Sequence, residues 1–320
     1  MFPKRILVGG FWCVISASLL AAEPLRGLAL RTNDVVGFVG GSDVAAAQFT
    51  GHLETLLAVK FPGVRFRNFG WEGDTVFAQP RDVGFPSLTN HLQRAGVTVL
   101  LVEFGRAEAR GGTKTVPEFV AAYQKLLNQC AAESSRIVLV TPPPFEAASD
   151  PVPDLSKRNK ELAAYVNAVQ TVGQRRGLPV IDLFSEFGGV AHVEPRLTDH
   201  GLQFTPRGHA LLAAGFARQL GFGELASQAG IVNEQGVWSN PPFEKLRQLV
   251  VEKNKLWFNY WRPQNWAFLG GDRTTQPSSR DHRDPKVRWF PAEMEKYVPL
   301  IREKEVEMEQ LAAEIRGGRK

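Results

Sequence analysis

Ser42 is the side chain best placed to act as a nucleophile. It follows a short apolar run and the pair Gly40-Gly41, and two glycines allow a tight turn that leaves the next side chain exposed. A serine hydroxyl at such a turn attacks a carbonyl carbon when a neighbouring base takes its proton. The other role open to Ser42 is to cap the following helix, because serine is a preferred N-cap residue. Position alone favours the cap.

Three further segments place polar residues just after apolar runs: residues 68–75, 105–108 and 198–209. In the first, the backbone N–H of Gly73 is suited to binding an oxyanion. The alternative is an ordinary turn in which Asp74 caps a helix. The last segment contains two histidines, His200 and His209. If these segments meet Ser42 in space, they supply the parts of a hydrolytic site.

The elements that must position these segments are visible as an alternating pattern from residue 34 to about 220. Between the apolar runs lie segments with the apolar spacing of helices. Such alternation predicts a parallel sheet covered by helices on both faces, and ligands of such sheets bind at the carboxyl ends of the strands. The expected strands are Val35–Val39, Val64–Phe69, Val97–Phe104, Ile137–Thr141 and Val180–Phe184.

In this order, at these strand ends, the segments resemble the blocks of the SGNH/GDSL hydrolases, the GDSL-like lipases and acylhydrolases. Phe38–Ser42 resembles the Gly-Asp-Ser block, and Asn68–Thr75 the block with the oxyanion glycine, here Gly73. Gly105–Glu108 resembles Gly-x-Asn-Asp/Glu, and Thr198–Gly208 resembles Asp-x-x-His with its Pro-x-Gly helix start. The resemblance implies a three-layer, flavodoxin-like α/β fold and a serine esterase, in an exported bacterial subgroup with a C-terminal extension.

The sequence departs from the family pattern at working positions. Gly41 stands where the family has aspartate, Ala107 at the oxyanion asparagine, Gln203 at the catalytic histidine and His200 at the usual aspartate. Glutamine cannot accept the serine proton, so its presence predicts a rate loss of several orders of magnitude. Loss of one oxyanion donor costs less, about 2.7–4 kcal/mol. Gln203 therefore decides the catalytic question.

His200 is the candidate substitute base, because it lies three residues before Gln203 and a shift of that loop would bring it toward Ser42. Asp199 would then orient its ring. The alternative, which we favour, is a surface-loop histidine. His209 lies inside an expected helix and is interpreted as a packed or helix-surface side chain.

Two functions follow from these residues. The first is a weak or atypical serine esterase acting on acylated carbohydrate or small esters, with Ser42 as nucleophile, Gly73 as oxyanion donor and His200 as base. The second is a catalytically degenerate hydrolase that binds a glycan or a partner protein without turnover. The resemblance favours the first function, and the chemistry of the residues favours the second.

The chain beyond residue 235 has a different character. A helix is expected over Phe243–Tyr260, followed by an aromatic-rich turn, a polar loop over residues 270–290 and a last helix over Pro291–Arg316. Aromatic rings beside polar groups suit a carbohydrate or a polar ester. The equally weighted alternative is that the tryptophans anchor the extension to the body. Candidate substrate-binding residues are Trp71, Arg262 and Asn265.

The last helix has heptad-like apolar positions that Lys304 interrupts. It is expected to pack back on the body. A short antiparallel or dimeric coiled coil, which would allow oligomerisation, is the second interpretation.

The N-terminus has the pattern of a bacterial-type secretory signal. Lys4 and Arg5 precede the apolar run Ile6–Leu20, and Ala21-Ala22 offers a cleavage site. The expected organisation is residues 1–22 signal peptide, 23–235 hydrolase-like domain and 236–320 extension. We expect a periplasmic or extracellular protein with no stable membrane span after cleavage; an uncleaved anchor is the alternative.

Charge and cysteine content limit the possible functions. The formal net charge is +5 with 38 basic and 33 acidic residues, and loss of Lys4 and Arg5 lowers it to +3. No basic block supports nucleic-acid binding. With Cys13 in the signal, Cys130 has no partner for a disulfide. No metal cluster, phosphate loop or dinucleotide motif is present, so no cofactor is expected.

Overall fold

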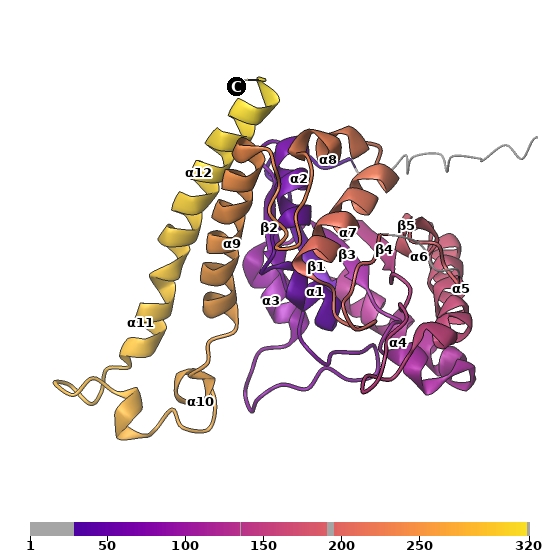
Figure 1. Ribbon diagram of the computed structural model, residues 1–320. Helices are drawn as coiled ribbons and strands as arrows, with labels where there is room; N and C mark the ends of the chain where they lie inside the picture. Colours follow the sequence, from indigo (N-terminus) through magenta and orange to yellow (C-terminus); the bar gives the residue numbers. More distant parts are fainter. Residues whose placement is uncertain (1–28, 135, 191–194, 319–320) are drawn as a thin grey trace, which may run out of the picture.

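Five parallel strands form one sheet in the order β2-β1-β3-β4-β5 (Figure 1). The computed structural model describes residues 29–134, 136–190 and 195–318. With helices on both faces, this is the expected three-layer, flavodoxin-like arrangement. The strands are β1 (Val35–Gly40), β2 (Arg65–Asn68), β3 (Val99–Glu103), β4 (Arg136–Thr141) and β5 (Val180–Asp182).

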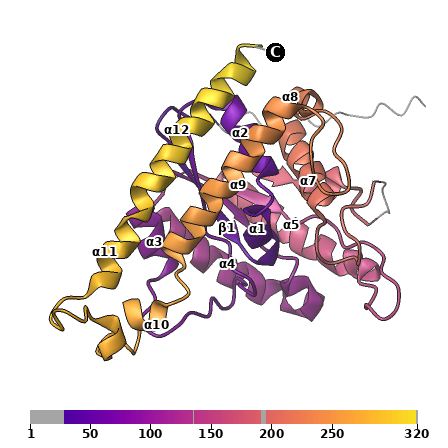
Figure 2. The same cartoon turned by 60° about the vertical axis from the view of Figure 1, so that its left-hand side comes forward.

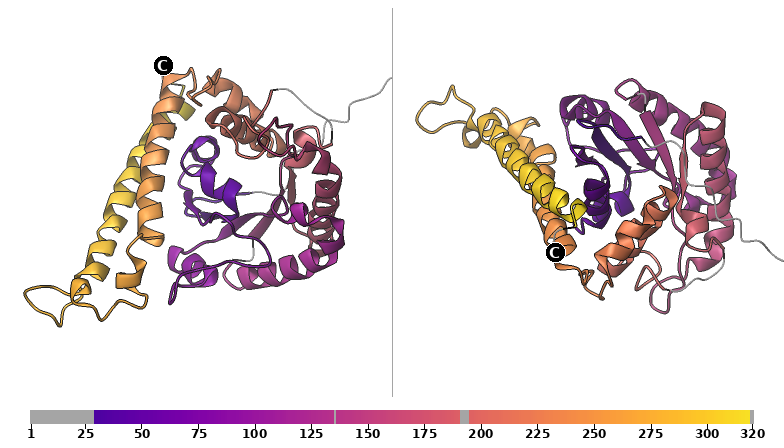
Figure 3. Two further views of the ribbon diagram at one scale, coloured as in Figure 1. Left: turned by 60° about the horizontal axis from the view of Figure 1, so that its bottom comes forward. Right: turned by 90° about the horizontal axis from the view of Figure 1, so that it is seen from above.

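Helices cover both faces of the sheet, as Figure 3 shows. One face packs against α3 (Leu88–Ala95), α4 (Val116–Ala131) and α5 (Asn159–Arg176). The other packs against α2 (His52–Lys60), α7 (Pro206–Gln219) and α8 (Gly223–Ala229), with the short α1 beside them. The remaining short helices of the body are α1 (Ser42–Ala47), η1 (Glu108–Gly111), η2 (Thr113–Thr115), η3 (Ser156–Arg158) and α6 (Leu183–Glu186).

The core is divided into two apolar layers by the sheet. Along β3, Leu100 and Val102 pack toward α4 and α5, whereas Val99 and Leu101 pack toward α2 and α7. Successive side chains of a strand point to opposite faces, so a strand covered on both sides must be apolar throughout. This requirement explains why β1, β3 and β4 were visible as apolar runs, whereas the edge strand β2, Arg65-Phe66-Arg67-Asn68, is mostly polar.

Two expected boundaries were wrong for local reasons. The strand expected to reach Phe184 ends at Asp182, because the Asp182 side chain accepts a hydrogen bond from the Ser185 N–H and starts α6. The spacing of Phe49, Leu53, Leu56 and Leu57 predicts one helix, but the helix is split at Gly51, whose φ of 72° lies in the left-handed region. Phe49 therefore falls between α1 and α2 and is exposed.

The C-terminal extension continues from the body as a long helix pair. It comprises α9 (Pro241–Trp261), α10 (Trp266–Leu269), η4 (Pro277–Ser279), α11 (Trp289–Glu295) and α12 (Tyr297–Arg316). Figures 1 and 2 show α12 antiparallel to α9, and α9 packs along β2 at the sheet edge. Lys304, which interrupts the apolar seam, forms an ion pair with Glu252 of α9 at 3.1 Å. The last helix thus packs back within the chain.

Three further predictions concern the N-terminal segment, the cysteines and membrane-spanning helices. The predicted signal, including Cys13, lies outside the described residues, and Cys130 is buried in α4. Among the helices of the described segments, none combines the length and hydropathy needed to cross a bilayer.

A buried ion pair joins α9 to α2. Lys253 is fully buried, its Nζ lies 2.6 Å from Glu54 Oε1, and it also donates to the Phe66 carbonyl of β2 at 3.1 Å. Burial lowers the pKa of Lys253. The pair therefore attaches the extension to both a helix and a strand of the body.

We expect Lys253→Met to lower the free energy of unfolding by about 3–5 kcal/mol, because it leaves the Glu54 carboxylate buried without its cation. Denaturant unfolding would measure the loss. Lys255→Met, at an exposed position of the same helix, is the matched control and should change stability little. Replacing both partners, Glu54→Leu with Lys253→Met, should recover much of the loss; equal losses in single and double variants would contradict this account.

Candidate active site

Ser42, Ala107 and Gln203 come together in one polar pocket of about 250 Å³. The pocket lies at the carboxyl ends of β1 and β3, where the chain connections leave the sheet in opposite directions. Ser42 is the first residue of α1 and is exposed. These three side chains therefore line one pocket, as the order of the segments predicted.

Ser42 does not cap α1. The N-cap position is Gly41, no side-chain capping bond forms, and Ser42 Oγ instead accepts a hydrogen bond from the Gly73 N–H at 3.3 Å. The turns after β1 and β2 must approach closely for this contact. A Cβ on Gly41 would lie 2.8 Å from the Asp74 carbonyl oxygen, and one on Gly70 would lie 2.4 Å from the Ala45 nitrogen.

The Gly73 turn presents a backbone N–H to Ser42 Oγ. Gly73 has φ of 81°, which favours glycine at this position. Asp74 caps no helix: both of its carboxylate oxygens accept hydrogen bonds from Arg81 at 2.7 Å. Burial raises the pKa of Asp74, and the Arg81 guanidinium opposes that shift. Asp74 therefore fixes the turn that presents the Gly73 N–H.

Glu108 holds the second and third segments together. Its carboxylate accepts hydrogen bonds from the Val76 and Gly105 N–H groups, both at 2.9 Å. The side chain is buried, and that burial raises its pKa. Ala107, next to it, lines the pocket with a methyl group and offers no side-chain donor to an oxyanion.

The loop that carries Gln203 is anchored at both ends. Glu146 accepts from the Leu197 and Thr198 N–H groups at 2.7 and 2.8 Å. Thr205 caps α7, and a Cβ on Gly208 would lie 1.8 Å from the Leu197 carbonyl oxygen. The Pro-x-Gly start of α7 thus allows close packing against Leu197. This contact holds the end of the loop that carries Gln203.

The two candidate histidines lie elsewhere. His200 and Asp199 are exposed, and neither lines the Ser42 pocket. His209 is buried on α7 with its ring centroid 5.7 Å from that of Phe204, and burial lowers its pKa to about 4. Within the described residues, the Ser42 pocket has no histidine in its lining, and no His, Cys, Asp or Glu group could hold a metal.

Arg106 was not singled out from the sequence, yet it lies at the centre of the site. It is 7% exposed and donates to the Leu202 carbonyl at 2.7 Å and to the Asp43 carboxylate at 3.2 Å. Its guanidinium also packs over the Phe204 ring at 4.6 Å. Arg106 thereby ties the residue before Gln203 to the residue after Ser42.

Glu103 is the second residue that the sequence reasoning missed. It ends β3 and lines the pocket, and burial together with the nearby Asp43 carboxylate raises its pKa to about 8. The signal was available: a glutamate stood inside an apolar run that was predicted to be buried on both faces. A charged residue there requires either a partner or a cavity.

The extension contacts the turn that contains Gly73 through Arg262. Its guanidinium lies 3.6 Å from the centre of the Trp71 ring, that of Arg81 lies 4.0 Å from the same ring, and Arg262 forms an ion pair with Glu72 at 2.5 Å. Trp71 and Arg262 thus come together, but as partners of each other. Asn265 lies in a different pocket, beside α11.

We expect Arg262→Ala to loosen the turn that holds Gly73, lowering stability by about 1–2 kcal/mol through loss of the cation–π contact and a surface ion pair. Hydrogen exchange should show faster exchange in the peptide covering residues 71–76. Arg283→Ala, an exposed arginine of the same extension, is the control. Unchanged exchange at 71–76 in Arg262→Ala would show that the extension does not support the turn.

Comparisons with known proteins agree with the fold. The model of the GDSL-like Lipase/Acylhydrolase family matches residues 38–211. A gut microbial diltiazem-metabolizing enzyme is similar in structure, with a TM-score of 0.54 and 13% identity over 92% of this chain and 96% of that one.

Two other solved structures cover less of this chain. The acetylxylan esterase Axe2 from Geobacillus stearothermophilus has a TM-score of 0.45 and 17% identity over 60% of this chain and 95% of that one. A lipase/acylhydrolase from Enterococcus faecalis has a TM-score of 0.41 and 21% identity over 61% and 96%. A search of curated proteins found no match. On the family match over more than half its length, the chain belongs to the GDSL-like lipase/acylhydrolase family.

Proposed function

We propose that this protein binds a small acyl ester, free or carried on a glycan, in the Ser42 pocket and hydrolyses it slowly or not at all. One observation carries the proposal: Gln203 shares the pocket with Ser42, whereas His200 is exposed and does not line it. These observations support a pocket of esterase type whose described lining has no histidine base beside Ser42.

The chemical consequence follows from proton transfer. A serine hydroxyl attacks an ester carbonyl only if its proton is taken as the new bond forms. The amide of Gln203 has no basic nitrogen, so it cannot take the serine proton as the family's histidine does. Removal of a member of such a triad costs several powers of ten in rate. Turnover by the family mechanism should accordingly be very slow.

Ligand binding does not need that base. The Gly73 N–H, the Ser42 hydroxyl and the Gln203 amide can donate hydrogen bonds to a carbonyl oxygen, and Arg110 adds a cation to the pocket lining. A volume of about 250 Å³ suits an acyl group rather than a whole large ligand. Trp71, a candidate sugar platform, already packs against two guanidinium groups. The acyl end is thus the part of a glycan ester that fits best.

Gln203→His should create or raise esterase activity, because it supplies the missing base beside Ser42. We expect a gain in kcat/KM of about 10²-fold toward p-nitrophenyl acetate, and more in His200→Asp/Gln203→His, where a carboxylate can orient the new imidazole. Adding Ser42→Ala to either variant should abolish the gain, which makes it the control for background hydrolysis.

The same assay separates the two functions. Wild-type activity that is lost in both Ser42→Ala and His200→Ala would overturn the binding proposal and establish a weak esterase with His200 as base. For binding itself, we expect triacetin to bind the wild type and to bind Gln203→Ala several-fold more weakly by calorimetry. No detectable triacetin binding would remove the support for an ester ligand.

Export is part of the proposal. The basic residues, apolar run and small residues at the N-terminus support a cleaved signal. We expect N-terminal sequencing of the protein purified from its native cell envelope to begin near Glu23. A mature chain that still begins at Met1 would instead support an anchor.

A further inference from the structure

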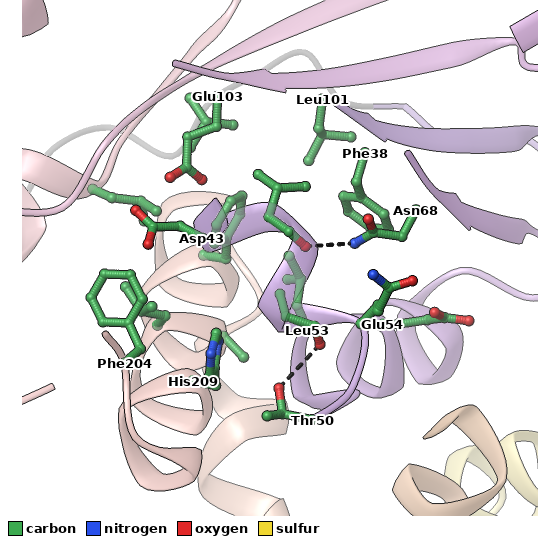
Figure 4. Close-up of a pocket in the computed structure, with 18 of the residues that line it drawn as sticks. Phe38, Asp43, Thr50, Leu53, Glu54, Asn68, Leu101, Glu103, Phe204 and His209 are labelled. Carbon is green, nitrogen blue, oxygen red and sulfur yellow. Dashed lines mark hydrogen bonds between the residues drawn. The ribbon is translucent and has the colours of Figure 1, made fainter. Parts of the chain in front are cut away.

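A second cavity, of about 70 Å³, lies between the sheet and helices α1, α2 and α7 (Figure 4). It is separate from the pocket proposed to hold the ester. Most of its wall is apolar, as expected for space inside a core. The apolar lining includes Phe38, Leu53, Leu101, Val140, Leu212 and Phe216.

One end of this cavity is acidic. Asp43 and Glu103 line both the cavity and the Ser42 pocket, and Figure 4 shows their carboxyl groups close together. Asp43 is paired with Arg106 at 3.2 Å. Among the described residues, none donates a hydrogen bond to the Glu103 carboxyl group. Asp43 and Arg106 affect it only through the electrostatic interaction of their charges. Glu103 is therefore available to a ligand.

Two buried amides add free acceptors elsewhere in the cavity lining. Gln48 and Asn254 are 2% and 1% exposed, both line the cavity, and Gln48 Oε1 and Asn254 Oδ1 have no hydrogen-bond partner. Their NH₂ groups are already used, donating to the Ala45 carbonyl and the Glu54 carboxylate. Buried polar atoms without partners are rare and usually mark a bound water or ligand.

The other charged groups around the cavity are paired or neutral, although Arg106 Nε has no hydrogen-bond partner among the described residues. Glu54 is paired with Lys253 at 2.6 Å, and Arg106 is engaged with Asp43 and the Leu202 carbonyl. Burial lowers the pKa of His209 to about 4, so its ring is neutral at pH 7. What remains free is an apolar wall with acceptors, one of them a carboxyl group. The matching ligand has an apolar body and a positively charged group that donates hydrogen bonds.

We propose that this cavity binds a small primary aliphatic ammonium ion, with its alkyl chain among the apolar residues and its ammonium group at Glu103. The site goes beyond the proposed ester binding and does not depend on Ser42 chemistry. It adjoins the ester pocket through Asp43 and Glu103.

Affinity should increase with pH. Burial and the Asp43 carboxylate raise the pKa of Glu103 to about 8, so at pH 7 most Glu103 is protonated. A bound cation favours the ionised form of Glu103, so binding below the pKa of Glu103 must release a proton. An alkylammonium ion has a pKa near that of lysine, about 10.4, and therefore stays charged over this pH range. We expect the affinity for n-butylammonium to rise about fivefold between pH 6.5 and 8.5.

Calorimetry with n-butylammonium, n-butanol and butyrate tests the site in the full-length protein. For a ligand of this size, we expect a Kd on the order of 1 mM for n-butylammonium and at least about tenfold weaker binding of the two isosteres. Glu103→Gln should weaken n-butylammonium binding about tenfold and remove its pH dependence. Glu118→Gln, at an exposed position of α4, is the matched control and should behave as wild type.

Ala47→Leu tests where the ligand binds, because it places a larger side chain in the cavity lining. Ala213→Val also reduces the volume of the cavity, with a smaller added side chain. Either variant should weaken n-butylammonium binding while keeping a cooperative thermal unfolding transition. Equal affinity for n-butanol and n-butylammonium, or unchanged binding in Glu103→Gln, would overturn the proposal. Because the readout is binding rather than ester hydrolysis, failure here is distinguishable from failure of the proposed function.

Discussion

The close approach of the turns after β1 and β2 is the contact on which the site depends. At Gly41 and Gly70 the neighbouring backbone lies where any Cβ would have to be, at 2.8 and 2.4 Å. This contact places the Gly73 N–H at hydrogen-bonding distance from Ser42 Oγ. It is made by the backbone, so it survives changes in the side chains that would perform catalysis.

Hydrogen bonds and close packing hold the segments of the site together. Glu108 ties the second and third segments together through backbone N–H groups, and Thr205 and Gly208 fix the start of α7. None of these residues needs to transfer a proton. Ala107 and Gln203, by contrast, contribute a methyl group and an amide to the pocket lining. The contacts that hold the segments together therefore do not depend on these two side chains.

Buried charge organises the rest of the molecule. Lys253 joins the extension to α2 and β2, and Arg106 joins the Gln203 loop to Asp43. Each cation is held by both a carboxylate and a carbonyl oxygen, which compensates for the loss of water around it. Glu103 differs, because it faces cavities rather than a dedicated partner. Packing alone gives no account of this partly exposed carboxyl group.

The sequence by itself determined the layer order and the strand-end segments, because side chains covered on both faces must be apolar and tight turns need glycine. It also singled out Ser42, Ala107 and Gln203, which the structure brings into one pocket, and Gly73, whose N–H donates to Ser42 Oγ. It could not determine the partners of Arg106, Glu103 or Lys253, since each contact joins segments far apart in the chain. Only the tertiary structure decided that His200 lies outside the pocket and that Arg262 packs on Trp71. Those outcomes depend on how loops and helices pack, which no local pattern specifies.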